Sequence, residues 1–169
     1  LDEAIIRLLH LHAGHTPDLR NWTNMVHRIK KPAKDVTLAI VGKYIHLKDA
    51  YKSIQEAFVH AGARHNTRMN IKWIDSERVS KEGPAILAGL NGILVPGGFG
   101  DRGIEGKIEA IRLAREKKIP FFGICLGMQC AVIEFARNVL GYRKAHSSEF
   151  DPASPHPVID LMQDQKTVK

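Results

Sequence analysis

The sequence has 169 residues, 44% of them hydrophobic, which is enough for one globular domain with a sizeable core. It has no apolar run near the length of a membrane span and does not open with a signal-peptide pattern, so we expect no membrane partner. The net charge is +7, but the basic residues are scattered, which favours a small anionic ligand or ordinary solvated faces over a nucleic-acid partner.

The first part of the chain is predicted to be helical. Apolar residues at helical spacing predict one helix over residues 2–12 and a second over residues 18–29. Residues 30–34, which are rich in lysine and include a proline, indicate a linker. We therefore expect residues 1–34 to be a helical extension and residues 35–169 to form the main domain. Because the chain opens with leucine, we also expect it to be a piece of a longer protein.

In the main domain, predicted strands alternate with predicted helices. Continuous β-branched and apolar runs are typical of buried parallel strands, and amphipathic runs between them are typical of covering helices. The strands are expected at residues 36–41, 69–74, 92–95 and 158–162, the helices at 50–60 and 104–118, and a strand followed by a helix at 121–140. This alternation predicts an α/β fold with a doubly wound, mostly parallel sheet.

Some boundaries and connections are predicted from single residues. Asp49 is expected to cap the helix over residues 50–60, and Gly62 is expected to end it. Residues 76–90 are predicted as an irregular stretch followed by a short helix. Residues 141–157 are predicted as a loop.

The most informative motif is Gly-Ile-Cys-Leu-Gly at residues 123–127, where an apolar run turns into a helix. It is the thiol version of the Gly-x-Ser-x-Gly nucleophile elbow, in which a sharp turn leaves no room for side chains beside the nucleophile. Cys125 would sit at a helix N-terminus, which favours a negatively charged sulfur. A lone cysteine can equally be a small buried hydrophobe, so the motif alone leaves both interpretations open.

A second glycine-rich turn supports the catalytic interpretation. Residues 96–100, Pro-Gly-Gly-Phe-Gly, follow the predicted strand at 92–95, and loops after parallel strands gather at one edge of the sheet. The backbone N–H of Leu126 could then converge with that of Gly97 or Gly98. Such a pair of donors forms an oxyanion hole, and losing one donor typically costs about 3–4 kcal/mol of transition-state stabilisation.

With these two motifs in place, the sequence resembles the triad-type glutamine amidotransferases, and more narrowly the CTP synthase family. The match is carried by motifs that span nearly the whole chain, at residues 41–44, 49–53, 96–106, 123–129 and 147–150. The resemblance implies a class I glutamine amidotransferase, flavodoxin-like domain after the helical end of a synthetase domain and its linker. The two cysteines, Cys125 and Cys130, have no disulfide spacing, which fits a reducing, cytoplasmic setting.

The resemblance also implies a reaction. Cys125 would attack the amide carbon of L-glutamine and form a thioester, and the released ammonia would serve the ATP-dependent amination of UTP to CTP. Glu149 would bind the α-amino group, since a carboxylate suits an ammonium. The residues implied to hold glutamine are Gly98, Leu126, Gly127, Met128, Gln129 and Glu149.

Other implied groups lie outside this chain. We expect no cofactor or metal in the chain itself, ATP and Mg in the synthetase domain, GTP as an allosteric activator and a homotetramer as the full-length assembly. By resemblance, Lys52, Glu56 and Arg102 lie where GTP or interdomain coupling is expected. From the residues alone, Lys52 and Glu56 are an i,i+4 pair on a helix.

The sequence departs from the family in one respect. The family's histidine and glutamate, which activate the thiol, lie in a motif that does not occur here, so the domain is expected to be incomplete at its C-terminus. His146 and His156 are the only histidines after Cys125, and we do not expect either to be the base. We therefore predict little glutamine turnover by this chain alone, and an exposed apolar sheet face or edge. Two alternatives stay open: a single-domain cysteine hydrolase, and a non-enzymatic binding or assembly module.

Overall fold

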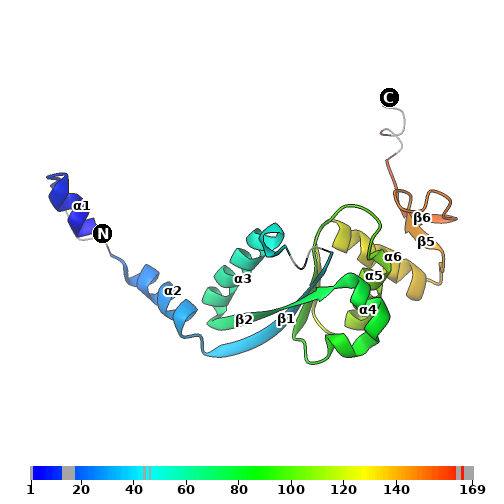
Figure 1. Cartoon of the computed structure of the whole chain (residues 1–169), viewed down its shortest axis with the longest axis horizontal. Coiled ribbons are helices and arrows are strands. Elements are labelled where there is room, and N and C mark those ends of the chain that lie inside the picture. The colour runs from blue at the N-terminus through cyan, green and yellow to red at the C-terminus, as the bar shows by residue number, and fades with distance from the viewer. Residues whose placement is uncertain (1, 13–17, 44, 46, 163–164, 166–169) are drawn as a thin grey trace.

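The structure is a computed structural model that describes residues 2–12, 18–43, 45, 47–162 and 165 (Figure 1). Helix α1 (Asp2–Leu8) has no buried residue and lies apart from the rest of the protein. Helix α2 (Arg20–Lys30) packs against α3 (Lys52–His65) and β2 (Thr67–Asp75). The predicted linker at residues 30–34 is shorter than expected, because α2 runs to Lys30 and the first strand begins at Lys34.

Four parallel strands form the central sheet. They are β1 (Lys34–Gly42), β2, β3 (Gly92–Val95) and β4 (Phe121–Gly123), in the order β2-β1-β3-β4. The chain therefore steps from β1 to β2 on one side and crosses back to β3 on the other. This reversal creates a switch point at the carboxyl ends of β1 and β3, where ligands bind in folds of this kind. The predicted α/β fold with a parallel sheet is confirmed.

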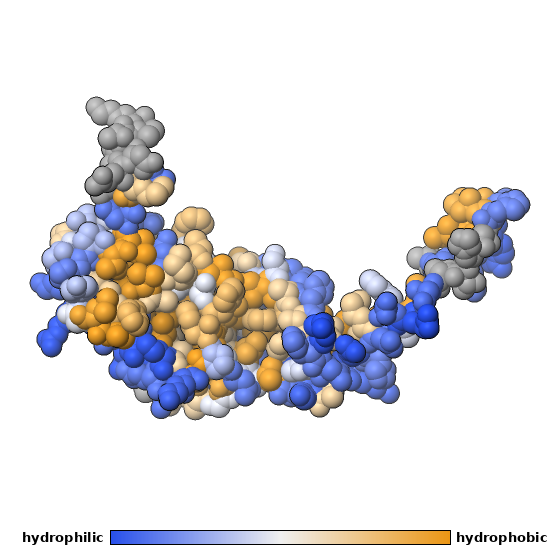
Figure 2. Space-filling view, turned by 180° about the vertical axis from the view of Figure 1, so that it is seen from behind, coloured by the Kyte–Doolittle hydropathy of each residue, from blue (hydrophilic) through white to orange (hydrophobic). Residues whose placement is uncertain are grey.

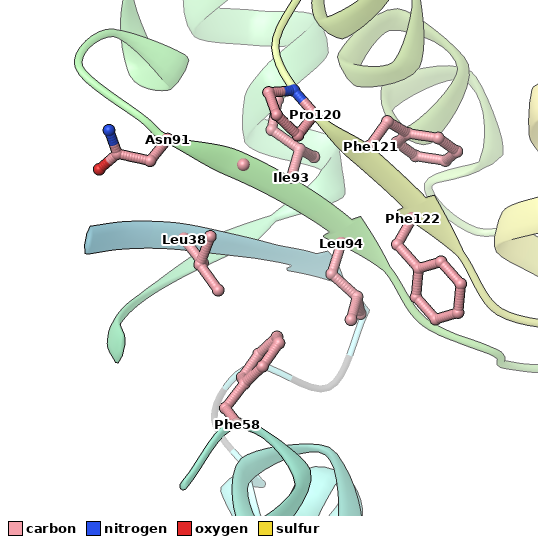
Figure 3. A pocket seen from close by; sticks show the side chains of 9 residues that line it. Leu38, Phe58, Asn91, Ile93, Leu94, Pro120, Phe121 and Phe122 are labelled. Carbon is pink, nitrogen blue, oxygen red and sulfur yellow. The ribbon is translucent and has the colours of Figure 1, made fainter. Parts of the chain in front are cut away.

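Helices cover both faces of the sheet. Helices α4 (Ser76–Glu82), α5 (Ile104–Glu116) and α6 (Leu126–Asn138) lie together on one side, and α3 lies on the other (Figure 1). Alternate residues of each strand point to opposite faces, so Ala39 and Val41 join the buried core of α5 and α6. Leu38 instead faces the side on which α3 places Phe58 (Figure 3).

The α3 side of the sheet is only partly covered. An apolar pocket of about 270 Å³ lies there, lined mainly by side chains of β1, β3, β4 and Phe58 (Figure 3). Phe122 of β4 is 63% exposed at its border. Figure 2 shows hydrophobic side chains gathered across the middle of the molecule as seen from behind. The chain thus presents an apolar sheet face to solvent, as expected from its sequence.

The predicted ends of the helix over residues 50–60 were wrong. Asp49 lies in a short 3₁₀ helix, η1 (Lys48–Tyr51), and α3 follows with Tyr51 at its capping position. The helix continues past Gly62 to His65 and ends at Asn66, which has a left-handed φ of 53°. A Cβ at Gly62 would overlap the Thr67 carbonyl oxygen. This glycine therefore lets the helix approach β2 and does not end the helix.

Two connections also differ from the predictions. The Asp75 side chain accepts a hydrogen bond from the Glu77 N–H at 2.8 Å, so α4 begins at once and a 3₁₀ helix, η2 (Gly83–Leu87), follows it. The predicted loop at residues 141–157 contains β5 (Ala145–Ser147) and the start of β6 (His156–Ile159), which pair in parallel. The last strand is therefore earlier than the predicted 158–162.

Candidate active site

The corner between β4 and α6 holds Cys125 in an unusual backbone conformation. Its φ is 51° and its ψ is −111°, a region that a residue with a side chain rarely occupies. The Ile124 N–H donates to the Val95 carbonyl at 2.9 Å, and the Gln129 N–H donates to the Cys125 carbonyl at 3.1 Å. The surrounding backbone thus holds the cysteine in this turn. Its side chain is exposed to solvent, as a nucleophile requires.

The two glycines of the motif are required by close backbone contacts. A Cβ at Gly127 would overlap the carbonyl oxygen of Val95, so only glycine lets α6 lie this close to β3. A Cβ at Gly123 would stand 2.6 Å from the carbonyl carbon of Gly127. From the sequence, the lack of room for a side chain was expected beside the nucleophile. In the structure, the crowded atoms are backbone atoms of β4, α6 and β3.

The second glycine turn lies next to the sulfur. A Cβ built on Gly97 would be 3.4 Å from the Cβ of Cys125 and 4.0 Å from its sulfur. Gly98 lies beside Leu126, whose side chain is 2% exposed. The structure therefore brings together Cys125 and the three residues predicted to form the oxyanion hole.

A lysine that the sequence analysis did not single out helps to hold this turn. The Lys43 ammonium, just after β1, donates to the Phe99 carbonyl at 3.3 Å. Arg102 donates to the Lys43 carbonyl at 3.3 Å and pairs with Glu77 at 3.1 Å. Lys43 could have been found from the sequence by its position at the end of a buried strand, on the same sheet edge as the glycine turn.

Glu149 and Gln129 share a pocket of about 450 Å³ close to the elbow. Its lining consists of Gln129, Ser147, Ser148, Glu149, Ile159, Asp160 and Leu161. Glu149 is exposed, and its N–H donates to the Ser147 hydroxyl at 3.3 Å. Ser148 donates to Asp160 at 2.7 Å, which joins the two sides of the pocket. A mainly apolar pocket with several polar side chains and a carboxylate at its border is suited to an amino-acid ligand.

Not every predicted ligand residue lines this pocket. The Met128 side chain is 49% exposed and lines an apolar surface of α6 with Val132 and Phe135. Gly127 is buried against β3. The binding of glutamine by Gly127 and Met128 stays a prediction.

The two histidines after the elbow have other partners. The His146 ring is 15% exposed, and its Nδ1 accepts the Ser147 N–H at 2.9 Å. Burial lowers the pKa of His146, and the nearby Arg137 guanidinium lowers it further. His156 stacks on Tyr142 with ring centroids 4.7 Å apart. Neither ring hydrogen-bonds to Cys125 in the part of the chain that the structure describes.

The second cysteine differs sharply from the first. Cys130 is fully buried, and burial raises the pKa of its thiol to about 11. The buried Lys107 ammonium is close enough to oppose this shift, and its own pKa is lowered by burial. A neutral, enclosed thiol is a poor nucleophile. The structure therefore distinguishes an accessible Cys125 from an inert Cys130.

The residues linked by resemblance to GTP or interdomain coupling form ordinary surface pairs. Lys52 and Glu56 make an exposed i,i+4 ion pair at 2.7 Å, which raises the pKa of Lys52 and lowers that of Glu56. Arg102 pairs with Glu77 instead.

Among the described residues, no group of three or more His, Cys, Asp or Glu side chains could hold a metal ion. None of the described helices has the length and apolar character needed to cross a bilayer.

Curated proteins are similar to this chain in sequence. CTP synthase of Carboxydothermus hydrogenoformans is 58% identical over all of this chain and 32% of its own length. CTP synthase of Clostridium acetobutylicum is 57% identical over 99% of this chain and 31% of its own length. The chain thus spans about a third of the length of these curated relatives.

A solved structure and a family model agree with these relatives. The glutaminase domain of Trypanosoma brucei CTPS with bound acivicin is similar with a TM-score of 0.72 and 43% identity, covering 76% of this chain and 51% of that one. The family model described as glutamine amidotransferase class-I matches residues 46–166. Because this match takes in most of the chain and the elbow lies inside it, the protein belongs to the class-I glutamine amidotransferase family.

Proposed function

We propose that this chain carries the nucleophile and part of the substrate pocket of a CTP synthase glutaminase. The observation that carries the proposal is the position of Cys125, which is exposed at a strained elbow and faces the Gly97 turn. The high identity to proteins named CTP synthase supports the choice of reaction. The relative from Trypanosoma brucei binds acivicin in its glutaminase domain, which supports a ligand site of the same kind here.

In the proposed reaction, the Cys125 sulfur attacks the amide carbon of glutamine. The backbone N–H groups of Leu126 and of Gly97 or Gly98 stabilise the oxyanion that forms. The C–N bond then breaks, the nitrogen leaves as ammonia after taking up a proton, and a thioester remains. Water hydrolyses the thioester to glutamate and restores the thiol. Glu149 holds the α-ammonium group throughout.

The proton acceptor for this reaction is proposed to come from outside this chain. His146 and His156 have other partners in the described structure. Members of a catalytic triad act as a unit, so a nucleophile without its base loses most of the rate. We therefore expect covalent reaction at Cys125 with activated electrophiles, but little turnover of glutamine by the isolated chain.

The rest of the proposal concerns the longer protein. Ammonia released at Cys125 would aminate UTP in a synthetase domain that uses ATP and Mg, with GTP as activator through the region of Lys52, Glu56 and Arg102. We propose a homotetramer in the cytoplasm as its working form. The free thiols of Cys125 and Cys130 suit a reducing compartment.

Covalent labelling tests the proposal. The chain is incubated with acivicin or a diazo-ketone analogue of L-glutamine, and the modified residue is located by mass spectrometry. We expect modification of Cys125 and not of Cys130, protection by L-glutamine, and no modification in the Cys125→Ser variant. If iodoacetamide labels Cys125 but the glutamine analogues do not, the glutamine pocket is wrong and a different cysteine hydrolase is favoured. If neither reagent labels Cys125, the chain is a binding or assembly module.

A further inference from the structure

Arg137 connects three separate parts of the candidate site. It lies in the last turn of α6, and its side chain is 16% exposed. Its Nε donates to the Ala145 carbonyl at 2.6 Å, and its Nη1 donates to both carboxylate oxygens of Glu105 at 2.9 and 3.0 Å. One guanidinium therefore joins α6 to β5 and to the first turn of α5.

Each of these elements carries a different group of the site. Helix α6 begins at the elbow that holds Cys125. Glu105 is the second residue of α5 and follows the glycine turn that faces the sulfur. Ala145 starts β5, which leads to Ser147 and Glu149 in the pocket shared with Gln129. Arg137 thus lies on one of these segments and hydrogen-bonds to the other two, through Ala145 and Glu105, neither of which is a predicted ligand residue.

The bond to Ala145 ties the start of β5 directly to α6, whereas the pairing of β5 with β6 and the bond from the Ser154 hydroxyl to the Lys144 carbonyl at 2.7 Å hold β5 only to its own neighbours in the chain. The Ala145 N–H donates to the Tyr142 carbonyl within the preceding turn, so it does not reach α6. A charge-assisted bond from a fork-shaped guanidinium is short and directional, and lysine cannot reproduce its geometry. The Nε2 atom of the neighbouring His146 stands 4.0 Å from a carboxylate oxygen of Glu105.

We propose that Arg137 is a positioning residue that sets the place of Glu149 relative to Cys125. This inference rests on the proposed function, in which these two groups hold opposite ends of glutamine. A displacement of about 1 Å in such a pair can reduce the rate of a positioned reaction by up to about 10²-fold. Reagents that do not use Glu149 are insensitive to the displacement.

The test compares two reagents on three chains: wild type, Arg137→Met and Arg112→Met. Arg112 is the matched control because its carboxylate partners, Glu109 and Glu116, lie on its own helix α5. The ratio of the labelling rate by acivicin to that by iodoacetamide is measured at Cys125. We expect this ratio to fall about tenfold in Arg137→Met and to stay unchanged in Arg112→Met. An unchanged ratio in Arg137→Met overturns the inference and leaves the proposed function intact.

A second readout does not depend on glutamine binding. Hydrogen exchange of the amides of residues 145–150 is expected to be faster in Arg137→Met than in Arg112→Met, with α6 equally protected in both. Equal exchange in the two variants overturns the inference. If Arg137→Met does not fold, Arg137→Lys keeps the charge and is expected to give an intermediate acivicin ratio. A wild-type ratio in Arg137→Lys would assign Arg137 a charge role only and contradict the geometric one.

Discussion

Gly97 stands against the side chain of Cys125, with space for a single methyl group between them. A Cβ there would be 4.0 Å from the sulfur, which is an ordinary van der Waals contact. Gly97→Ala is therefore expected to fold with nearly wild-type stability, yet its methyl group would occupy the space beside the thiol. We predict that acivicin labels Cys125 at least several-fold more slowly in this variant, while the urea midpoint changes little. Normal labelling would show that the substrate does not use this space.

Gly127→Ala is predicted to act on the fold rather than on the site. Its Cβ would overlap the Val95 carbonyl, so α6 must move away from β3. Overpacking of this kind lowers the free energy of unfolding by about 1–3 kcal/mol. Because the overlap here is with backbone, we expect a loss near the upper end of this range for Gly127→Ala. The loss is measured by urea unfolding followed by circular dichroism. The control is Gly98→Ala, whose Cβ would meet only a Leu126 methyl group at 4.0 Å. Equal stability of both variants would contradict the packing argument.

The ion pair between α5 and α6 gives a third prediction. Arg115 donates to the Glu134 carboxylate at 2.8 Å, and the Glu134 side chain is only 2% exposed. Removing one partner of a fully buried pair costs about 3–5 kcal/mol, but Arg115 is 37% exposed and Asn138 still donates to Glu134, so we expect about 1–2 kcal/mol for Arg115→Met. The double variant Arg115→Met/Glu134→Met should recover part of this loss in urea unfolding. A double variant less stable than the single one would contradict the argument.

The fourth prediction concerns pH. Burial lowers the pKa of His146 in the folded chain below its ordinary value of 6.5. Between the folded and unfolded pKa values the unfolded chain binds more protons, so the free energy of unfolding rises with pH. Stability contributed by the neutral ring is therefore present above pH 6.5 and falls as the pH drops toward the lower folded pKa. We expect urea midpoints at pH 7.5 and 5.5 to differ less in His146→Gln than in wild type. His156→Gln, at an exposed ring, should keep the wild-type difference.

Much of the fold could be predicted because buried parallel strands are continuous apolar runs. The strand at residues 92–95 matches β3, and the strand–helix alternation led to the correct sheet type. Strand β5 was missed and the last strand was predicted two residues late, because this stretch is rich in proline and turn residues and its position depends on contacts with α6 such as the Arg137 bond to Ala145. Gly62 was misassigned because a glycine needed for close packing has the same signature as one that ends a helix.

The candidate site was predictable where a residue type has few other uses. A cysteine between two glycines and a second glycine-rich turn point to one corner of the sheet, and the structure places Gly97 beside Cys125 there. Lys43 and Arg137 were not predicted as part of the site. A lysine after a strand and an arginine in the last turn of a helix are both common surface features, and only the fold shows which carbonyls they bind.

Strand β4 stands at the edge of the sheet, unpaired on its far side within the described chain, and it delivers Cys125. A strand added in parallel along that side would finish at the same end as β4, so its last residues would emerge beside the sulfur. The exposed ring of Phe122 offers such an addition an apolar surface to cover. A segment or partner that paired with this edge would therefore also determine which groups the thiol meets.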